Sequence, residues 1–233
     1  MKTMDMPQYR GLGRNSLRSR NGHHIVSGQE YRSRTFGHLN LFQRNNLTLG
    51  GQSLDLDDGP PYGMIGRDTK EQGGFAFYAH GGYAQAIYAD LLQGDVDGVE
   101  LLQFGVYRGI GLEDWYGVLN IGYRFPATGA CDFPACRKLG DCKTYIYHDG
   151  EPTFDQWLQA AREGRSFVTT GPMLEFEIDG HRPGDVINVS GGGGKNITAT
   201  VNISSEVAPV THLQLIINGR VVHEEQVSPP IFH

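Results

Sequence analysis

Apolar residues in this chain fall into short runs and helix-spaced stretches that alternate between residues 73 and 104. Residues 75–79 are apolar throughout and too few for a helix, so they predict a buried strand. Between 83 and 92 the apolar positions recur at helical spacing, and 96–102 form a second apolar run. A strand, a helix and a strand in this order predict a βαβ unit and therefore a parallel sheet.

The same reasoning predicts further elements on both sides of this unit. Short apolar runs predict strands at 25–27, 36–42, 124–128, 145–147 and 166–169. Helical spacing predicts two helices, at 112–122 and 154–162. Thr153 is the expected N-cap of the second helix, and Gly164 marks its end. Residues 43–72 are polar and rich in Gly and Pro, which is typical of a functional loop, a lid or a short helix.

Beyond Pro172 the pattern changes to strict alternation. Strand-like runs occur at 175–178, 186–189, 197–203 and 213–222. Turn residues separate these runs, and no helical stretch lies between them. Asn218-Gly219 is the turn expected inside the last run. We therefore predict an α/β domain over 25–171 and a small antiparallel β-sandwich over 172–233, whose last residues resemble a tail or a truncation.

Charge separates the first residues from the rest. The chain has 233 residues and a net charge of -6, yet residues 1–34 carry seven Lys or Arg against two Asp or Glu. The basic residues lie among Gly, Asn and Ser without interleaved aromatic residues, so a nucleic-acid partner is not expected. Residues 1–24 are interpreted as a basic, poorly ordered head.

Other classes of protein are constrained by what the sequence contains. No apolar run approaches the ~20 residues that a membrane-spanning helix needs, and the first residues lack the apolar core of a signal peptide. The odd count of three cysteines argues against a disulfide framework. The compartment and the oligomeric state are not encoded in any readable pattern.

Candidate metal ligands stand at or near the ends of predicted strands. These candidates are Glu30, His38, His80 and Asp132. Two imidazoles and two carboxylates form a ligand set that suits Zn²⁺, Mn²⁺ or Fe²⁺. Each comes from a different strand, so only a sheet or a barrel would bring them together. The alternative is that they are unrelated surface and core residues, and that His80 is a capping or buried structural histidine.

Several blocks of this sequence, in the same order, resemble one known family. The blocks are GQEYRSRTFGHLNL, FYAHGGYAQAIYADLL, DGVELLQF, WYGVLNIGYRFPATGACDFPACR and WLQAAREGRSFVTTGPMLEFEIDG. They are similar to the carbaryl-hydrolase-like (CehA/McbA) branch of the polymerase and histidinol phosphatase (PHP) superfamily, over roughly residues 25–225. The resemblance implies a distorted (β/α) barrel, a metal cluster at its C-terminal rim and a metal-activated water that attacks an ester-like bond.

Residue by residue, the resemblance implies a ligand set. Glu30 matches the Glu of the Gly-x-Glu block, and His38 matches the His of the Gly-His-x-Asn block. His80 matches the His that usually precedes Pro-Gly and here precedes Gly-Gly. Asp132 matches the Asp of the last metal motif, in which Pro134 stands where many members have His.

The family's barrel begins with a strand that ends in His-x-His. No such motif precedes Glu30, and the adjacent His23 and His24 would diverge on a strand. We therefore expect this chain to contain a partial barrel that lacks its first strands, followed by the β-sandwich.

Further residues near the expected site have two interpretations each. Asp132 would serve as ligand and general base, and Arg137 would neutralise an oxyanion or form a structural ion pair. Glu100 would lie behind the ligands or pair with a buried Arg. Trp115 and Tyr116 would line a pocket for an aromatic substrate or belong to the core.

The cysteines Cys131, Cys136 and Cys142 straddle Asp132 with a spacing that matches no zinc ribbon. They are small buried residues or, in the case of Cys131, a thiol ligand that replaces the missing His.

Two functions are compatible with these residues and their pattern. The first is a metal-dependent hydrolase that acts on a small-molecule ester, carbamate or phosphoester. The alternative is a non-catalytic remnant that acts as a binding or surface-interaction module through its β-sandwich.

Overall fold

The computed structural model describes residues 23–33, 36–42, 61–81, 87–103, 106–107, 112–189, 196–206 and 208–227. Most of the predicted basic head lies outside the described residues, as do the stretch 43–60, the glycine-rich stretch 190–195 and the tail 228–233.

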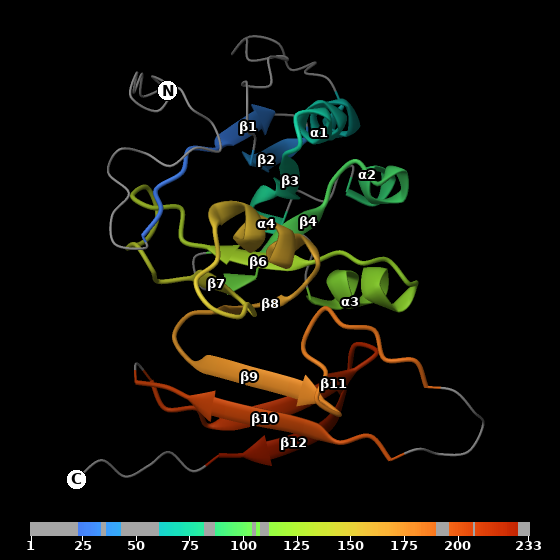
Figure 1. The fold of residues 1–233 in the computed structure, drawn as a ribbon, viewed down its shortest axis with the longest axis vertical. Helices are drawn as coiled ribbons and strands as arrows, with labels where there is room; N and C mark the ends of the chain where they lie inside the picture. Colours follow the sequence, from blue (N-terminus) through green and yellow to red (C-terminus); the bar gives the residue numbers. More distant parts are fainter. Residues whose placement is uncertain are drawn as a thin grey trace.

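The described residues form a mixed α/β fold around one six-stranded sheet. Its strands are β1 Gln29–Ser33, β2 Gly37–Phe42, β3 Phe75–Tyr78, β4 Gly98–Gln103, β5 Val106–Tyr107 and β6 Ala127–Ala130. The described helices are α1 Tyr62–Glu71, α2 Ile87–Gln93, α3 Leu112–Asn120 and α4 Phe154–Arg162, with a 3₁₀ turn, η2, at Ala79–Gly81. A separate antiparallel pair, β7 Lys143–Ile146 and β8 Ser166–Thr169, lies beside β6 (Figure 1).

The sheet combines both pairing directions. β1 pairs with β2, and β2 with β3, in antiparallel fashion, whereas β3 and β6 both run parallel to β4. Leu102 of β4 is paired with Tyr107 of β5 and also with Gly129 of β6, so β5 and β6 lie on opposite edges of β4. The described strands do not close into a barrel.

The central β3–α2–β4 unit has the parallel pairing expected from its sequence, which confirms the βαβ prediction. Its strand β3 is buried at every position because both faces are covered. Ala76 and Tyr78 join the larger core cluster, whereas Phe75 and Phe77 pack with Leu158 of α4. A continuous apolar run, without alternation, is the sequence signature of such a strand.

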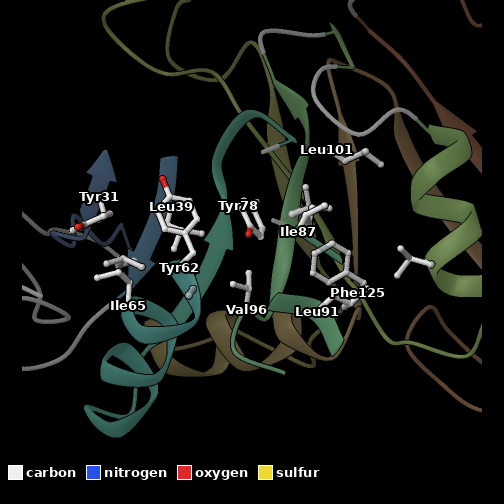
Figure 2. Packing of buried hydrophobic residues seen from close by; sticks show 14 residues of the cluster. Tyr31, Leu39, Tyr62, Ile65, Tyr78, Ile87, Leu91, Val96, Leu101 and Phe125 are labelled. Carbon is white, nitrogen blue, oxygen red and sulfur yellow. The ribbon is translucent and has the colours of Figure 1, made fainter. Parts of the chain in front are cut away.

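The larger core cluster joins the sheet to α1, α2 and α3. Tyr62 and Ile65 of α1 and Ile87 and Leu91 of α2 pack against sheet residues such as Tyr78 (Figure 2). Val118 of α3 and Phe125 extend the same cluster. The two faces of β3 therefore belong to two different hydrophobic clusters.

Some elements differ from the sequence prediction in position. The first strand is Gln29–Ser33, beyond the predicted run 25–27, and it pairs with β2 from Gln29 opposite Leu41 to Ser33 opposite Gly37. The predicted strand 124–128 begins later, at Ala127, since Pro126 has no N–H to contribute to a ladder. α1 occupies the end of the polar passage 43–72, which fits the short-helix interpretation.

Helix α4 begins and ends as its sequence predicts. The Thr153 hydroxyl accepts the N–H of Gln156, and the Gln156 side chain accepts the N–H of Thr153, which together form a capping box. Gly164 follows with a φ of 72°. These reciprocal bonds satisfy donors that the first turn would otherwise leave unpaired.

The remaining strands are arranged as two antiparallel pairs. β9 Met173–Ile178 pairs with β10 Ala199–Ser204, and β11 His212–Ile217 pairs with β12 Arg220–Gln226. The predicted turn at Asn218-Gly219 is present, with φ values of 53° and 75°. No described residue from 171 to 227 is buried, and the stretch predicted as a strand at 186–189 has no strand.

Hydrogen bonds connect these strands to the α/β part. The Tyr147 hydroxyl donates to the carbonyl of Leu174, and the Asn120 amide donates to the carbonyl of Asn218. Among the described residues, no helix is long and apolar enough to cross a membrane.

Candidate metal centre

Strand alternation brings Glu30 and His38 to one face of the sheet. Glu30 is paired with Asn40 across β1 and β2, so His38 is its diagonal neighbour on the same face. Leu39 of β2 faces the core and is paired with Tyr78, which places His38 beside the turn that follows β3. His80 lies in that turn, so two paired strands and the turn after the third strand each supply one side chain.

The three side chains are in direct contact. His38 Nδ1 lies 2.8 Å from His80 Nε2 and 3.0 Å from Glu30 Oε1. The two imidazole rings meet edge to face at a centroid distance of 4.7 Å. One donor atom from each residue lies within 4.8 Å of the other two, so this group could hold a metal ion.

The donor set fits a divalent transition metal. Two imidazole nitrogens and one carboxylate oxygen are the protein ligands of a common type of catalytic zinc site, which leaves a fourth position open. Ligands about 2.0–2.1 Å from zinc at tetrahedral angles lie roughly 3.3 Å apart. The 2.8 Å and 3.0 Å contacts would therefore lengthen by a few tenths of an ångström. The proton shared between the imidazoles would leave, because ligands bind deprotonated.

Arg32 orients the carboxylate of Glu30. Its Nε and Nη2 lie 2.9 Å and 2.6 Å from Glu30 Oε2, which leaves Oε1 directed at His38. Burial alone raises the pKa of Glu30, but hydrogen bonds from His38 and Arg32 and their positive charges outweigh it and bring the pKa to about 2. Glu30 is therefore an anion at neutral pH. Arg32 is absent from the site predicted from the sequence, although alternation along β1 places it on the same face as Glu30.

His80 is held in its neutral form. Burial lowers its pKa below the usual 6.5, and the adjacent His38 lowers it further, while Glu30 and Asp132 act in the opposite direction. A neutral imidazole is the form that binds metal. His80 is half-buried and its backbone is left-handed, with φ and ψ both 41°.

Glu100 lies directly behind His80. Its Oε2 accepts the backbone N–H of His80 at 2.7 Å and a side-chain N–H of Gln103 at 3.2 Å. Burial raises its pKa to about 7, against the hydrogen bond from His80, and the charges of Asp132 and Glu30 contribute to the rise. Among the described residues no Arg pairs with Glu100, so the ion pair considered from the sequence is not found.

Asp132 lies near the group but outside it. It is exposed, follows β6 and has a φ of 50°. The three residues within ligand distance of one another do not include it, although its charge affects the pKa of His80 and of Glu100. Arg137 is exposed on the loop that follows.

The cysteines have different environments. Cys131 and Cys142 are buried with Leu102 in a small apolar cluster, as expected of small core residues. Cys136 is exposed, and its thiol donates to Asp132 Oδ2 at 3.1 Å. The thiol in contact with a candidate ligand is therefore that of Cys136, and not that of Cys131, to which the sequence assigns a possible ligand role.

The aromatic residues of α3 belong to the packing of the fold. Trp115 packs against the larger core cluster and donates its indole N–H to the carbonyl of Phe125 at 2.7 Å. Tyr116 contacts Trp115 and lies against Gly219 of the last turn. These contacts favour the core interpretation of both residues over a substrate pocket.

Two comparisons with known proteins bear on this centre. No protein-family model matches the chain, and no curated protein is similar to it. The chemistry of the centre is therefore defined by its residues and their geometry.

Proposed function

We propose that this protein is a metal-dependent hydrolase of the PHP type, acting on an ester, carbamate or phosphoester bond of a small molecule. The observation that carries the proposal is the convergence of Glu30, His38 and His80. Glu30 and His38 come from the paired strands β1 and β2, and His80 lies 42 positions after His38, in the turn that follows β3. The resemblance of their sequence blocks to the carbaryl-hydrolase-like branch supports the same assignment.

Two of the three side chains are in the protonation state that a metal ligand needs. Glu30 is ionised at neutral pH, and the lowered pKa of His80 keeps its imidazole neutral. When bound, a divalent ion would supply Lewis-acid activation of a water molecule and of the substrate's carbonyl or phosphoryl group. Zn²⁺, Mn²⁺ and Fe²⁺ all suit this donor set.

The remaining roles fall to residues on the loop after β6. Asp132 is close enough for its charge to affect His80, and we assign it as a further ligand or as the group that accepts a proton from the attacking water. Arg137 is exposed on the same loop, where it would contact a developing oxyanion. The partial PHP-like barrel, with β1 to β4 and β6 as its strands, is the corresponding proposal for the fold.

The proposal is tested by metal content and turnover. Purified protein is incubated with Zn²⁺ or Mn²⁺, freed of excess ion, subjected to elemental analysis and assayed on 1-naphthyl acetate and bis(p-nitrophenyl) phosphate. We expect stoichiometric metal and turnover that both disappear in His38→Ala and persist in His223→Ala, a matched change at an exposed histidine of β12. Folded wild-type protein without bound metal and without turnover would refute the assignment.

A second candidate function rests on a hollow elsewhere in the molecule. A cavity of about 320 Å³ is lined by Ile146 of β7, Tyr147 just after it, Glu175 and Phe176 of β9, and Arg182. The metal group does not line this cavity. A cavity shows only that a ligand has space to bind, whereas the donor atoms of Glu30, His38 and His80 indicate a specific chemistry. We therefore rank the hydrolase function first.

The hollow is compatible with a binding module that recognises a polar ligand next to β9 and β10. Binding of a polar small molecule that is lost in Arg182→Ala and unchanged in His80→Ala would favour this second function.

A further inference from the structure

We propose that Glu100 is a positioning residue, which fixes the turn carrying His80 so that its imidazole faces His38 and Glu30. The inference rests on the proposed metal centre and adds to it a residue that is not itself a ligand. It is carried by the backbone geometry of His80 and by the hydrogen bonds that end at one carboxylate oxygen.

The turn at His80 has a conformation that side chains disfavour. His80 has a φ of 41°, and Gly81 follows with a φ of 78°. A left-handed backbone is uncommon for residues other than Gly, and it persists where the surroundings hold it in place. The conformation matters here because it sets the direction in which the imidazole leaves the backbone, towards His38 Nδ1 at 2.8 Å.

Glu100 supplies the bond that holds this turn. Its Oε2 accepts the N–H of His80 at 2.7 Å, across 20 positions of the chain. Glu100 is only 4% exposed and stands in the middle of β4, next to η2, so the acceptor is attached to a rigid strand.

Gln103 in turn orients the Glu100 carboxylate. Its side-chain N–H donates to the same Oε2 at 3.2 Å, and the other end of its amide, Oε1, is a buried acceptor with no partner among the described residues. An unsatisfied buried acceptor costs about 1–3 kcal/mol. The Gln103 amide is therefore oriented so that its N–H bonds Glu100, although its own oxygen is left without a described partner.

This arrangement is not the one that stability alone would favour. No described cation is paired with Glu100, so ionising this buried carboxyl group is expensive. An apolar side chain of similar volume would fill the same space at lower cost, but it would leave the N–H of His80 without an acceptor. The need to hold His80 in place explains why position 100 carries a carboxyl group.

Two substitutions of Glu100 separate placement from charge. Glu100→Gln keeps an acceptor oxygen at the same reach and removes the charge. Glu100→Asp keeps the charge and withdraws the oxygen by about 1.5 Å, the length of one carbon–carbon bond. A role through charge and a role through the hydrogen bond therefore predict opposite orders of effect.

The experiment measures zinc affinity by competition with a chromophoric chelator, together with hydrogen exchange of the His80 amide by NMR in metal-free protein. We expect Glu100→Gln to bind zinc within about threefold of wild type and to keep the amide protected. In Glu100→Asp we expect affinity to fall about 10- to 100-fold, the usual loss when a residue supporting a ligand is changed, and the amide to exchange fast.

The result that overturns the proposal is equal affinity of Glu100→Asp and wild type, or a loss in Glu100→Gln as large as in Glu100→Asp. The latter would make Glu100 a ligand or a source of charge. If wild-type protein binds no zinc, the metal centre fails, while the exchange rate of the His80 amide still decides whether Glu100 holds this turn. An unprotected amide in wild-type protein refutes the positioning role in either case.

Discussion

Two buried carboxyl groups, Asp97 just before β4 and Glu100 within it, accept backbone N–H groups at the two ends of β3, and they differ in whether a cation is paired with them. At the amino end, Asp97 accepts the N–H of Ala76 and lies 3.1 Å from Arg162 and 3.4 Å from Lys70. At the carboxyl end, Glu100 accepts the N–H of His80, and no described cation is paired with it.

The difference separates a structural end from a functional one. Asp97 pairs with two cations and accepts a backbone N–H of β3. These stabilising interactions explain why a buried carboxylate occurs at this position. Glu100 bonds a turn in a disfavoured conformation, and that turn carries a candidate ligand. The left-handed turn at His80 and the buried carboxyl group without a described cation both lie where parallel strands usually place their chemistry. Substitutions at each end test whether the two ends are independent.

The largest expected effect is at the carboxyl end. His80→Ala removes one of the three proposed ligands, and zinc affinity should fall more than about 100-fold, beyond the loss caused by changing a supporting residue. His223→Ala should leave the affinity unchanged. Competition with a chelator measures the zinc affinity of both variants. Wild-type affinity in His80→Ala would contradict a functional role for this end of the strands.

At the amino end, Asp97→Ala should affect stability and spare the metal. The N–H of the buried Ala76 loses its acceptor and two cations lose their partner, so we expect about 2–4 kcal/mol less free energy of unfolding. Urea denaturation measures the loss. Zinc affinity of the folded variant should stay within about threefold of wild type, and a tenfold decrease would show that the two ends are coupled.

Packing beside the amino end should be sensitive to a single methyl group. A Cβ added at Gly98 would lie 2.5 Å from Phe77 and 2.6 Å from the carbonyl of Pro126, so Gly98→Ala should cost about 1–3 kcal/mol. Gly117 of α3 has nothing within 4 Å, and Gly117→Ala should instead stabilise by about 0.5–1 kcal/mol. Thermal unfolding of both variants checks the opposite signs.

The smallest expected effect concerns pH and Asp90. Burial raises the pKa of Asp90 above 3.8, nearby Asp95 contributes, and hydrogen bonds from Tyr78 and the Gly63 amide oppose the rise. The folded state therefore binds more protons than the unfolded state above pH 3.8, and stability falls as pH rises through the folded pKa.

Asp90→Asn does not titrate, and its amide oxygen can still accept from Tyr78. The stability of this variant relative to wild type should increase from pH 4 upward and then level off. Urea denaturation across that range measures the difference. A difference that is constant with pH would contradict the assigned direction.

The βαβ unit could be predicted from sequence because its signal is local. Residues 75–79 are apolar on both faces since helices cover both faces, and Thr153 caps α4 through bonds within four residues. Helix α1 was harder to predict because it contains Gly63 and Gly66. A Cβ at Gly66 would lie 2.1 Å from the carbonyl of Asp95, so the glycine that weakens the helical signal is the one that allows close packing.

The candidate site could be predicted only in part, for the same reason. Glu30 and His38 follow from alternation along two strands, and His80 follows from the end of a third. Asp132 depends on a loop whose path no periodicity encodes. The partner of Glu100 could not be predicted, because it is a backbone N–H made available by the left-handed turn at His80.

X-ray absorption spectroscopy of the protein loaded with one equivalent of Zn²⁺ at pH 7.5 tests the central claim most directly. We predict two imidazole nitrogens and oxygen ligands at about 2.0–2.1 Å, with the imidazole signal lost in the His38→Ala/His80→Ala double variant. A zinc shell without imidazole, or an unchanged spectrum in the double variant, would show that Glu30, His38 and His80 do not hold the ion.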